Sequence, residues 1–575
     1  MNKKQYLIFF IIINILITSN LFYNSQNINI QKNLIGNNSI SSESNLNSLW
    51  ISNGNVICNA SNGQVSTDLI IDSNGMIWVC WNDKRQDDGD IYLQQLSPNG
   101  NPNFQHNGIP IHNDTNYSSN PRMVSDGNGG VIVTWQDNRT GQNEVYLQRI
   151  NSIGQLLWGA SGIKAAEVSS VKEDPQIVKT SDGNIFVVWD DTRNADKDVY
   201  TQKLDIEGNK LWGANGIGVC NYTGVQGFQV LQDTVIATEN NEIVISWIDL
   251  RSDAGDIYIQ KLDADGNYQW LPNGSVICNE TDFQYESILK YLGNDETILT
   301  WRDNRNFALS DTNLYIQKIN RTGHAQWENN GTIIVNEIRS QTSQEISIYD
   351  ENNIFIVWED KHEDVNGDIY FQKFNRTGNN QLQSNGTVVA NKIGVEESPK
   401  IVSSDDFIFI AWENSSGFPY YISLIKYHIN GTEAWTSPKI IVNGTISPDI
   451  REMISDGKGG IIVTWFDQRN DVNGDLYMLR LNSSGGIWVP PPSNGGSEPP
   501  PDIWWIIILV LAITLPVAGV GAAGAVILIV RRRRQAPGKM PPKKAVPQIK
   551  LPEDQEQVLK NICTIMALIV VMKKE

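Results

Sequence analysis

Most of this chain consists of short apolar runs separated by turns rich in Gly, Asn and Asp. A typical run, Val131–Trp135, follows a Ser-Asp-Gly turn at residues 125–127. Runs of five to eight residues bounded by such turns predict β-strands. Residues 49–489 show no sustained 3.6-residue periodicity of the kind that predicts amphipathic helices. We therefore expect an all-β fold over this region.

A Trp-x-Asp-x-Arg motif recurs through these residues. The eight central tryptophans are spaced 54, 54, 58, 54, 57, 54 and 53 residues apart, which indicates a repeat architecture. Two copies are degraded, Trp358-Asp360-His362 and Trp412-Asn414-Ser416. The six complete copies begin at Trp81, Trp135, Trp189, Trp247, Trp301 and Trp465.

Each repeat predicts one four-stranded antiparallel sheet. After the Trp strand comes a strand with a Tyr-x-Gln core, such as Tyr200 and Gln202, and then a Gly turn with a Trp four residues later, such as Gly208 and Trp212. Four strands in about 54 residues, repeated radially, are typical of a β-propeller blade. We predict a propeller of about eight blades, with seven blades as the alternative.

The two ends of the repeat region indicate how the ring closes. The segment from Leu49 to Asn59 matches the fourth-strand segment from Leu211 to Asn221, yet it precedes the first complete repeat. The last repeat runs into Pro490–Pro492 soon after its third strand. We therefore expect the N-terminal strand to complete the last blade, which would leave no open sheet edge.

These motifs resemble known propeller repeats. The unit is similar to extracellular β-propeller repeats of secreted prokaryotic proteins, and the segment Asp205–Trp212 is similar to the tryptophan-docking motif of quinoprotein propellers, which implies that Trp rings lock adjacent blades. The Ser-Asp-Gly turn resembles the Asp box of sialidases, but Ser125 lies ten residues before Trp135, a different spacing. The resemblance implies architecture more than activity.

Both ends of the chain carry targeting signals. A basic start followed by an apolar run, Tyr6–Ile17, is typical of a signal peptide or an uncleaved signal anchor. Twenty-eight uncharged residues followed by four arginines predict a transmembrane helix with a cytoplasmic tail. We divide the chain into a signal peptide or anchor (1–23), a linker (24–48), the propeller (49–489), a Pro/Gly/Ser stalk (490–502), a transmembrane helix (503–530) and a basic tail (531–575).

Charge and sequence motifs agree with a single-pass protein whose propeller is extracellular. The chain has a net charge of −19, and the tail contains 11 Lys and Arg against 4 Asp and Glu, which leaves −26 for residues 1–530. An acidic exterior disfavours nucleic acid as a partner. Asn-x-Ser/Thr triplets occur sixteen times before the predicted helix and never after it, which fits a glycoprotein. The five cysteines are too few for a disulfide scaffold, and we expect free thiols in the core.

The repeated charged residues are expected to be structural. An active site is one asymmetric constellation, whereas an Asp and an Arg present in nearly every blade are most simply a turn cap and an ion pair. Asp364–Asp368 and Asp471–Asp475 have the oxygen spacing of calcium loops, but hairpin turns are the preferred interpretation. No catalytic motif, metal site or cofactor site is predicted, and a quinone is disfavoured because the exterior has no adjacent cysteine pair.

Two functions of different classes follow. The degraded sixth and seventh repeats are free of the repeat constraint, so we expect ligand-binding residues there: His362, Phe418, Tyr420 and Tyr421. The main hypothesis is a cell-surface propeller that binds an extracellular glycan or protein without catalysis. The alternative is a surface hydrolase of the sialidase-like propeller kind, which requires one pocket on the propeller axis with convergent carboxylates and a perturbed pKa. The sequence gives no oligomeric state.

Overall fold

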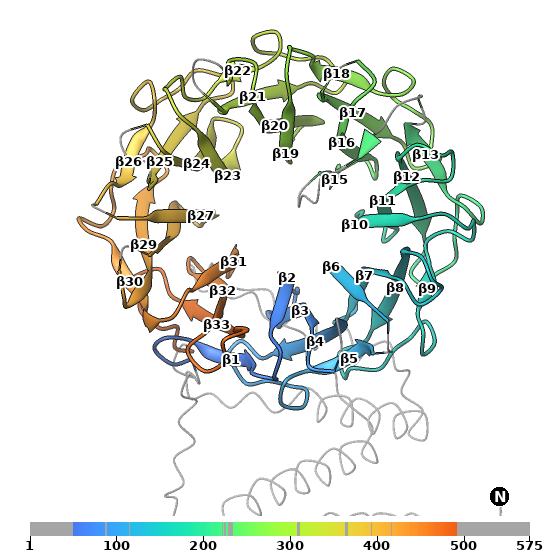
Figure 1. Cartoon of the computed structure of the whole chain (residues 1–575), viewed down its shortest axis with the longest axis horizontal. Helices are drawn as coiled ribbons and strands as arrows, with labels where there is room; N and C mark the ends of the chain where they lie inside the picture. Colours follow the sequence, from blue (N-terminus) through green and yellow to red (C-terminus); the bar gives the residue numbers. More distant parts are fainter. Residues whose placement is uncertain are drawn as a thin grey trace, which may run out of the picture. The chain divides into compact units, whose positions relative to one another are not determined.

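Eight antiparallel sheets form a closed ring around a central axis (Figure 1). The computed structural model describes residues 50–490 except 87–88, 114–115, 221, 223–225, 228–233, 253, 308–310, 363–365, 393 and 416. The predicted all-β propeller of eight blades is thus confirmed, while the proposed signal segment 1–23 and transmembrane helix 503–530 lie outside these residues. Within the described residues, no helix has the length and apolarity needed to cross a membrane.

Each blade runs from an innermost strand near the propeller axis to an outer strand at the periphery of the ring. Blades 1 to 4 contain β2 (Gln64–Ile71), β3 (Ile77–Asp83), β4 (Asp90–Leu96), β5 (Ile109–His112); β6 (Ser118–Ser125), β7 (Val131–Asp137), β8 (Glu144–Ile150), β9 (Ile163–Lys164); β10 (Lys172–Lys179), β11 (Ile185–Asp191), β12 (Asp198–Leu204), β13 (Ile217–Cys220); and β14 (Gln226–Gly227), β15 (Val235–Ala237), β16 (Ile243–Asp249), β17 (Asp256–Leu262), β18 (Ser275–Cys278). In blade 4 two short strands, β14 and β15, stand in the place of one innermost strand.

The remaining blades follow the same order. Blades 5 to 8 contain β19 (Gln284–Gly293), β20 (Glu296–Asp303), β21 (Asn313–Ile319), β22 (Thr332–Ile333); β23 (Gln341–Asp350), β24 (Asn353–Asp360), β25 (Asp368–Phe374), β26 (Thr387–Ala390); β27 (Glu396–Ser404), β28 (Phe407–Asn414), β29 (Tyr420–His428), β30 (Lys439–Thr445); and β31 (Asp449–Ser455), β32 (Ile461–Asp467), β33 (Asp475–Leu481) with β1 (Asn55–Cys58). The antiparallel register places the first hairpin and the turn after the third strand at one end of every blade. We call this end the Asp-turn rim and the opposite end the Arg-turn rim.

The N-terminal strand closes the ring as predicted. β1 pairs with β33, and Val56 lies opposite Tyr477. Trp50 and Ile57 are buried in a core that blade 1 shares with blade 8. The last blade therefore has no exposed third-strand edge, which removes a site of edge-to-edge association.

Adjacent blades are joined by a side chain that packs on a glycine of the next blade. A Cβ on that glycine would lie no more than 3.2 Å from the side chain, so only glycine fits. The predicted docking role of the Trp after the Gly turn is confirmed, with Phe or Leu in two blades. The pairs are Trp50/Gly100, Phe104/Gly154, Trp158/Gly208, Trp212/Gly266, Trp270/Gly323, Trp327/Gly378, Leu382/Gly431 and Trp435/Gly485.

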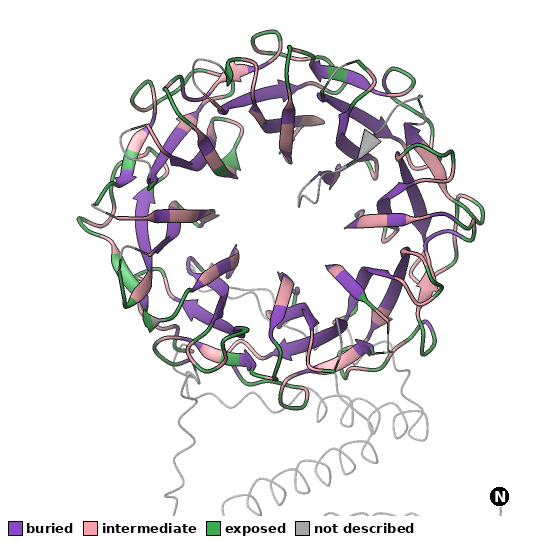
Figure 2. Ribbon diagram, viewed as in Figure 1, coloured by how far each residue is buried: buried purple, intermediate pink, exposed green. Residues whose placement is uncertain are grey.

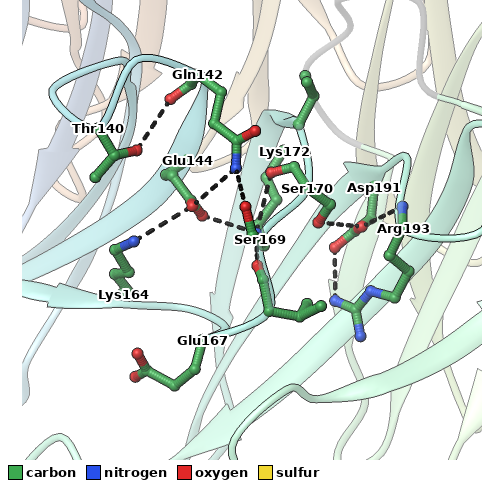
Figure 3. Close-up of polar contacts among 12 residues, drawn as sticks. Thr140, Gln142, Glu144, Lys164, Glu167, Ser169, Ser170, Lys172, Asp191 and Arg193 are labelled. Carbon is green, nitrogen blue, oxygen red and sulfur yellow. Dashed lines mark hydrogen bonds and ion pairs between the residues drawn. The ribbon is translucent and has the colours of Figure 1, made fainter.

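Blades 2 and 3 are also joined by a buried ion pair (Figure 3). The Lys172 ammonium lies 2.7 Å from a carboxylate oxygen of Glu144 and donates to the Val168 carbonyl at 2.6 Å. Lys172 is completely buried. Because both charges have polar partners, this pair avoids the cost of an uncompensated buried charge.

The core lies within and between the blades. Figure 2 shows the middle strands as buried, whereas the innermost strands carry positions of intermediate exposure. Cys58, Cys80, Cys220 and Cys278 are free and buried in this core, which confirms the expectation for these four thiols. Burial raises the pKa of the Cys220 thiol to about 11, so it is not a reactive thiolate at neutral pH.

Candidate functional site

The repeated Trp-x-Asp-x-Arg motif forms a closed network in the six blades that have a complete copy. In blade 3 the Trp189 indole N–H donates to Asp191 at 2.8 Å, and the Arg193 guanidinium lies 2.6 Å from the same carboxylate. The guanidinium also stacks 3.7 Å from the centre of the Tyr200 ring. These contacts recur in the other complete copies, so the structural interpretation of the motif is confirmed.

The electrostatics of this carboxylate agree with a structural role. Burial alone would raise the pKa of Asp191, but hydrogen bonds from Arg193, Trp189 and Ser170 outweigh burial and hold the pKa below its usual value. Asp191 is therefore an anion whose acceptor sites are occupied. It is not available as a catalytic acid.

His362 occupies the position of the missing arginine in blade 6. Its backbone N–H donates to Asp360 at 2.9 Å, and its Nδ1 lies 2.7 Å from the same oxygen. The imidazole meets the Tyr370 ring edge-on, with the ring centroids 5.3 Å apart. In this degraded repeat, a shorter side chain therefore takes the place of arginine in the same network.

The aromatic residues singled out in blade 7 lie at the Arg-turn rim. Phe418 is 74% exposed, and Tyr420 and Tyr421 are half-buried at the start of β29. In blade 7 the residue opposite the repeat tryptophan Trp412 is Ser423, so this blade has no tyrosine at that position. Tyr421 lies opposite Asn414, the position at which Asp198 lies opposite Asp191 in blade 3.

A cavity lies among the innermost strands at the propeller axis, and sequence reasoning did not identify the residues that line it. Its volume is about 560 Å³, within the range typical of small-molecule sites. It is lined by the innermost strands around this axis, and none of His362, Phe418, Tyr420 and Tyr421 contributes to its wall.

One position on the innermost strand supplies most of the charged residues of this cavity, and Lys290 of blade 5 is a further charged residue of its wall. The strand position pairs with the residue immediately before the repeat tryptophan, and unlike the repeat motifs its residue differs from blade to blade. From blade 1 to blade 8 the residues are Asp68, Arg122, Gln176, Thr234, Ile288, Glu345, Lys400 and Glu452. At this position, charged residues therefore occupy one arc, from blade 6 through blade 8 to blade 2, and uncharged residues the other.

Most charged groups of this arc are held by neighbours. Lys400 forms an ion pair with Glu345. Asp68 accepts a hydrogen bond from the backbone N–H of Leu69 at 2.9 Å and another from Met123, in the next blade, at 2.6 Å. These contacts fix both oxygens of Asp68 at the cavity wall.

Glu452 differs from the other two carboxylates of the arc. It is half-buried, and among the described residues its carboxyl group makes no hydrogen bond or ion pair. Burial raises the pKa of Glu452 to about 7, with further raising by Asp68 and Glu345 and opposing effects from Lys400 and Arg122. A carboxyl group with this pKa is partly protonated at neutral pH and can donate a proton.

A signal for this site was present in the sequence. The irregularity is not confined to the sixth and seventh repeats, because the Glu452 position varies around the whole ring. Aligning the copies on the repeat tryptophan would have revealed one variable position, polar in seven of the eight copies, 12 or 13 residues upstream. Within the described residues, no group of three His, Cys, Asp or Glu side chains is placed to hold a metal ion.

Comparisons with known proteins show likeness in fold. No protein-family model and no curated protein matches the chain. An ulvan lyase of a polysaccharide lyase family is 10% identical, with a TM-score of 0.43, over 78% of this chain and 98% of its own. An α-L-arabinanase of Penicillium chrysogenum is 12% identical, with a TM-score of 0.33, over 56% and 97%. Likeness at this level concerns the propeller fold alone.

Proposed function

We propose that the axial cavity binds a carbohydrate and hydrolyses a glycosidic bond, with Glu452 as the proton donor. This is the second of the two functions expected from the sequence. It is preferred because the cavity has the features required of an enzyme there: convergent carboxylates on the propeller axis and one perturbed pKa.

The observation that carries the proposal is the contrast between Glu452 and Asp68. Among the described residues the Glu452 carboxyl group has no hydrogen-bond or ion-pair partner, and burial raises its pKa to about 7, while Asp68 is fixed by two backbone N–H donors. Glycoside hydrolysis requires two carboxyl groups in different protonation states, and unlike environments produce that difference.

In the proposed reaction the Glu452 carboxylic acid gives its proton to the glycosidic oxygen as the C–O bond breaks. Asp68 stabilises the positive charge that develops on the sugar carbon or removes a proton from the attacking water. The water oxygen forms the new bond to carbon, and its released proton restores the acid. The separation of the two carboxyl groups with substrate bound decides between retention and inversion.

The rest of the cavity fits a polyhydroxylated ligand better than an acyl substrate. Lys400 and Arg122 supply donors beside the carboxylates, which supply acceptors. Ser347 and Ser455 also line the wall, but each lies beside another serine hydroxyl, at 2.7 and 2.8 Å, instead of a general base. No nucleophile–base pair is therefore formed by these serines.

A ligand-binding role without turnover is the second candidate. The 74% exposure of Phe418 at the tip of a blade 7 hairpin favours it, because exposed aromatic residues supply contact energy in recognition. Location at the cell surface, with residues 503–530 in the membrane, is part of both proposals.

The test is a hydrolysis and binding screen of the purified full-length protein against neutral and acidic oligosaccharides. We expect release of new reducing ends by the wild type and a loss of at least 100-fold in kcat for Glu452→Gln. Glu351→Gln is the matched control, because Glu351 is an ion-paired residue outside the cavity lining. Binding without turnover would reject hydrolysis, and binding lost on Phe418→Ala but kept in Glu452→Gln would favour the second candidate.

A further inference from the structure

Four Asn-x-Ser/Thr triplets lie in the turn after the third strand of blades 5 to 8. In blades 5, 6 and 8 the asparagine opens the turn, and its carbonyl accepts the N–H of a glycine three residues later at 2.9–3.0 Å. In blade 7 the triplet begins two residues farther along the same turn, at Asn430. The other three asparagines are Asn320, Asn375 and Asn482.

The hydroxyl of each triplet is already bonded to its asparagine. The Thr322 hydroxyl donates to Asn320 Oδ1 at 2.8 Å, and Thr377 does the same to Asn375 at 2.8 Å. The hydroxyl groups of Thr432 and Ser484 donate hydrogen bonds to Oδ1 of Asn430 and Asn482, respectively, each at 2.7 Å. Oδ1 also accepts the backbone N–H two residues on in every case. The carboxamide is therefore held in one orientation.

In this orientation the amide nitrogens are largely free of hydrogen bonds, and none of the four asparagines is buried. Among the described residues, Nδ2 of Asn320, Asn375 and Asn430 makes no hydrogen bond, and Nδ2 of Asn482 makes one long contact of 3.4 Å. The hydroxyl-bearing residues of all four triplets are exposed.

In three other triplets the asparagine amide is used by the fold. Asn330 Nδ2 donates to Glu280 at 2.6 Å, and Asn385 Nδ2 donates to Glu337, in each case across blades. Asn414 is only 4% exposed. A glycan on any of these nitrogens would displace a contact of the ring.

We propose that the folded protein carries N-linked oligosaccharides at Asn320, Asn375, Asn430 and Asn482, which cluster on the Asp-turn rim of blades 5 to 8. The corresponding turns of blades 1 to 4 begin with Ser97, Asn151, Asp205 and Asp263, and none of these starts an acceptor triplet. Glycans would then cover the Asp-turn rim of blades 5 to 8, while the same rim of blades 1 to 4 stays uncovered and can contact other molecules.

The modification is a transfer from a lipid-linked oligosaccharide donor. A bond forms between Nδ2 and C1 of the first sugar, the bond from C1 to the carrier phosphate breaks, and the carrier leaves as its phosphate. The amide nitrogen gives up one proton. Nothing in this step depends on chemistry in the axial cavity, so the two proposals fail independently.

The test is site-by-site glycopeptide mass spectrometry of the full-length chain made in a secreting, N-glycosylating host. We expect glycan on the four turn asparagines and unmodified Asn330, Asn385 and Asn414 in the folded fraction. Unmodified turn asparagines would overturn the proposal. Equal occupancy at Asn330 and Asn385 would do so as well, because the turn geometry would then select nothing.

Arg321→Pro provides a variant that keeps the turn. Asn-Pro-Thr is not an acceptor, and proline is favoured at the second position of such a turn. The Arg321 carbonyl, which accepts the Trp270 indole N–H at 3.1 Å, is retained. We expect the loss of one glycan mass with an unchanged Tm, whereas Arg321→Ala keeps the glycan. A glycan still present on Asn320 in Arg321→Pro would contradict the assignment.

Discussion

Arg469 of blade 8 donates a hydrogen bond to the carbonyl oxygen of Asn53, 3.0 Å away and 416 residues earlier in the chain. In blade 2 the equivalent Arg139 makes this bond to Ser161, and in blade 3 Arg193 makes it to Asn215, each at 2.9 Å within its own blade. The N-terminal segment thus takes the place of a fourth-strand segment in blade 8. It also accepts the hydrogen bond that the motif arginine makes within its own blade elsewhere.

This replacement predicts the effect of an N-terminal deletion. Removing residues 24–60 takes away Trp50 and β1 and exposes the edge of β33. Loss of a buried Trp alone costs about 3–5 kcal/mol. We expect a lower Tm and association through the open edge, measured by light scattering and thermal denaturation.

The matched control deletes residues 24–48 and leaves β1 in place. We expect its Tm and mass to equal those of the wild type. A 24–60 deletion that stays monomeric with an unchanged Tm would refute closure by β1.

Blade docking predicts a second measurable effect. Gly323 has a φ of +79°, and a Cβ there would lie 2.6 Å from the Trp270 ring. Gly323→Ala therefore combines a left-handed backbone, roughly 1–2 kcal/mol, with overpacking of about 1–3 kcal/mol. Gly183, with a φ of +91° and no atom within 4 Å of a Cβ, isolates the backbone part. Chemical denaturation should show a larger loss of unfolding free energy for Gly323→Ala than for Gly183→Ala. Equal losses would mean that contact with Trp270 does not require glycine at position 323.

The architecture could be predicted from sequence because it is repeated, whereas for the candidate site the sequence offers only the variability of one strand position. Eight copies of one Trp strand fix the blade number, and the match of Leu49–Asn59 to a fourth strand fixes closure. Glu452 and Asp68 belong to no motif. Their significance arises only when the ring brings distant strands to one axis, and the pKa of Glu452 depends on burial, which no sequence pattern reports.

His362 provides a test of the binding surface expected from the degraded repeats. Because His362 contacts Asp360 as arginine does in other blades, His362→Arg should restore the common network and keep or raise the Tm. Ligand binding should be unchanged if His362 is structural. Weaker binding at an equal Tm would instead show that His362 belongs to the binding site. Thermal denaturation and a binding titration on the same sample decide between the two.

Glu413 predicts how stability depends on pH. Its side chain is 7% exposed and accepts the Ile450 N–H at 2.6 Å, and burial followed by Asp449 and Glu397 raises its pKa to about 9. An unfolded glutamate titrates near pH ~4.3, so the folded state binds more protons between that pH and about 9. This group's contribution is therefore lost as pH rises through that window.

Glu413→Gln removes this titration with a side chain that another blade already uses. Gln136 occupies the same position in blade 2 and accepts the Asp174 N–H at 3.3 Å. We expect the unfolding free energy of the variant, relative to that of the wild type, to rise between pH 5 and pH 8 by up to about 4 kcal/mol, because the folded pKa is about 9. Parallel curves from pH 5 to pH 8 would show that Glu413 is ionised in the folded protein.

The last prediction concerns the acid of the proposed reaction. If protonated Glu452 is required, kcat/KM falls as pH rises through about 7, the pKa that burial gives this carboxyl group. Lys400 is the cation with the largest opposing effect on that pKa. Lys400→Met removes it and leaves Glu345 without its ion-pair partner, and both changes disfavour a charged Glu452. The alkaline limb of the pH profile should therefore move to higher pH, even if kcat falls.

The matched control is Lys458→Met. Lys458 is an exposed residue of the following hairpin, so its substitution makes the same charge change outside the cavity lining and should not move the limb. A simple loss of folding lowers activity at every pH without shifting the limb, so the direction of the shift separates a proton donor from a structural residue. A limb that stays in place, or moves to lower pH, would mean that Glu452 is not the acid.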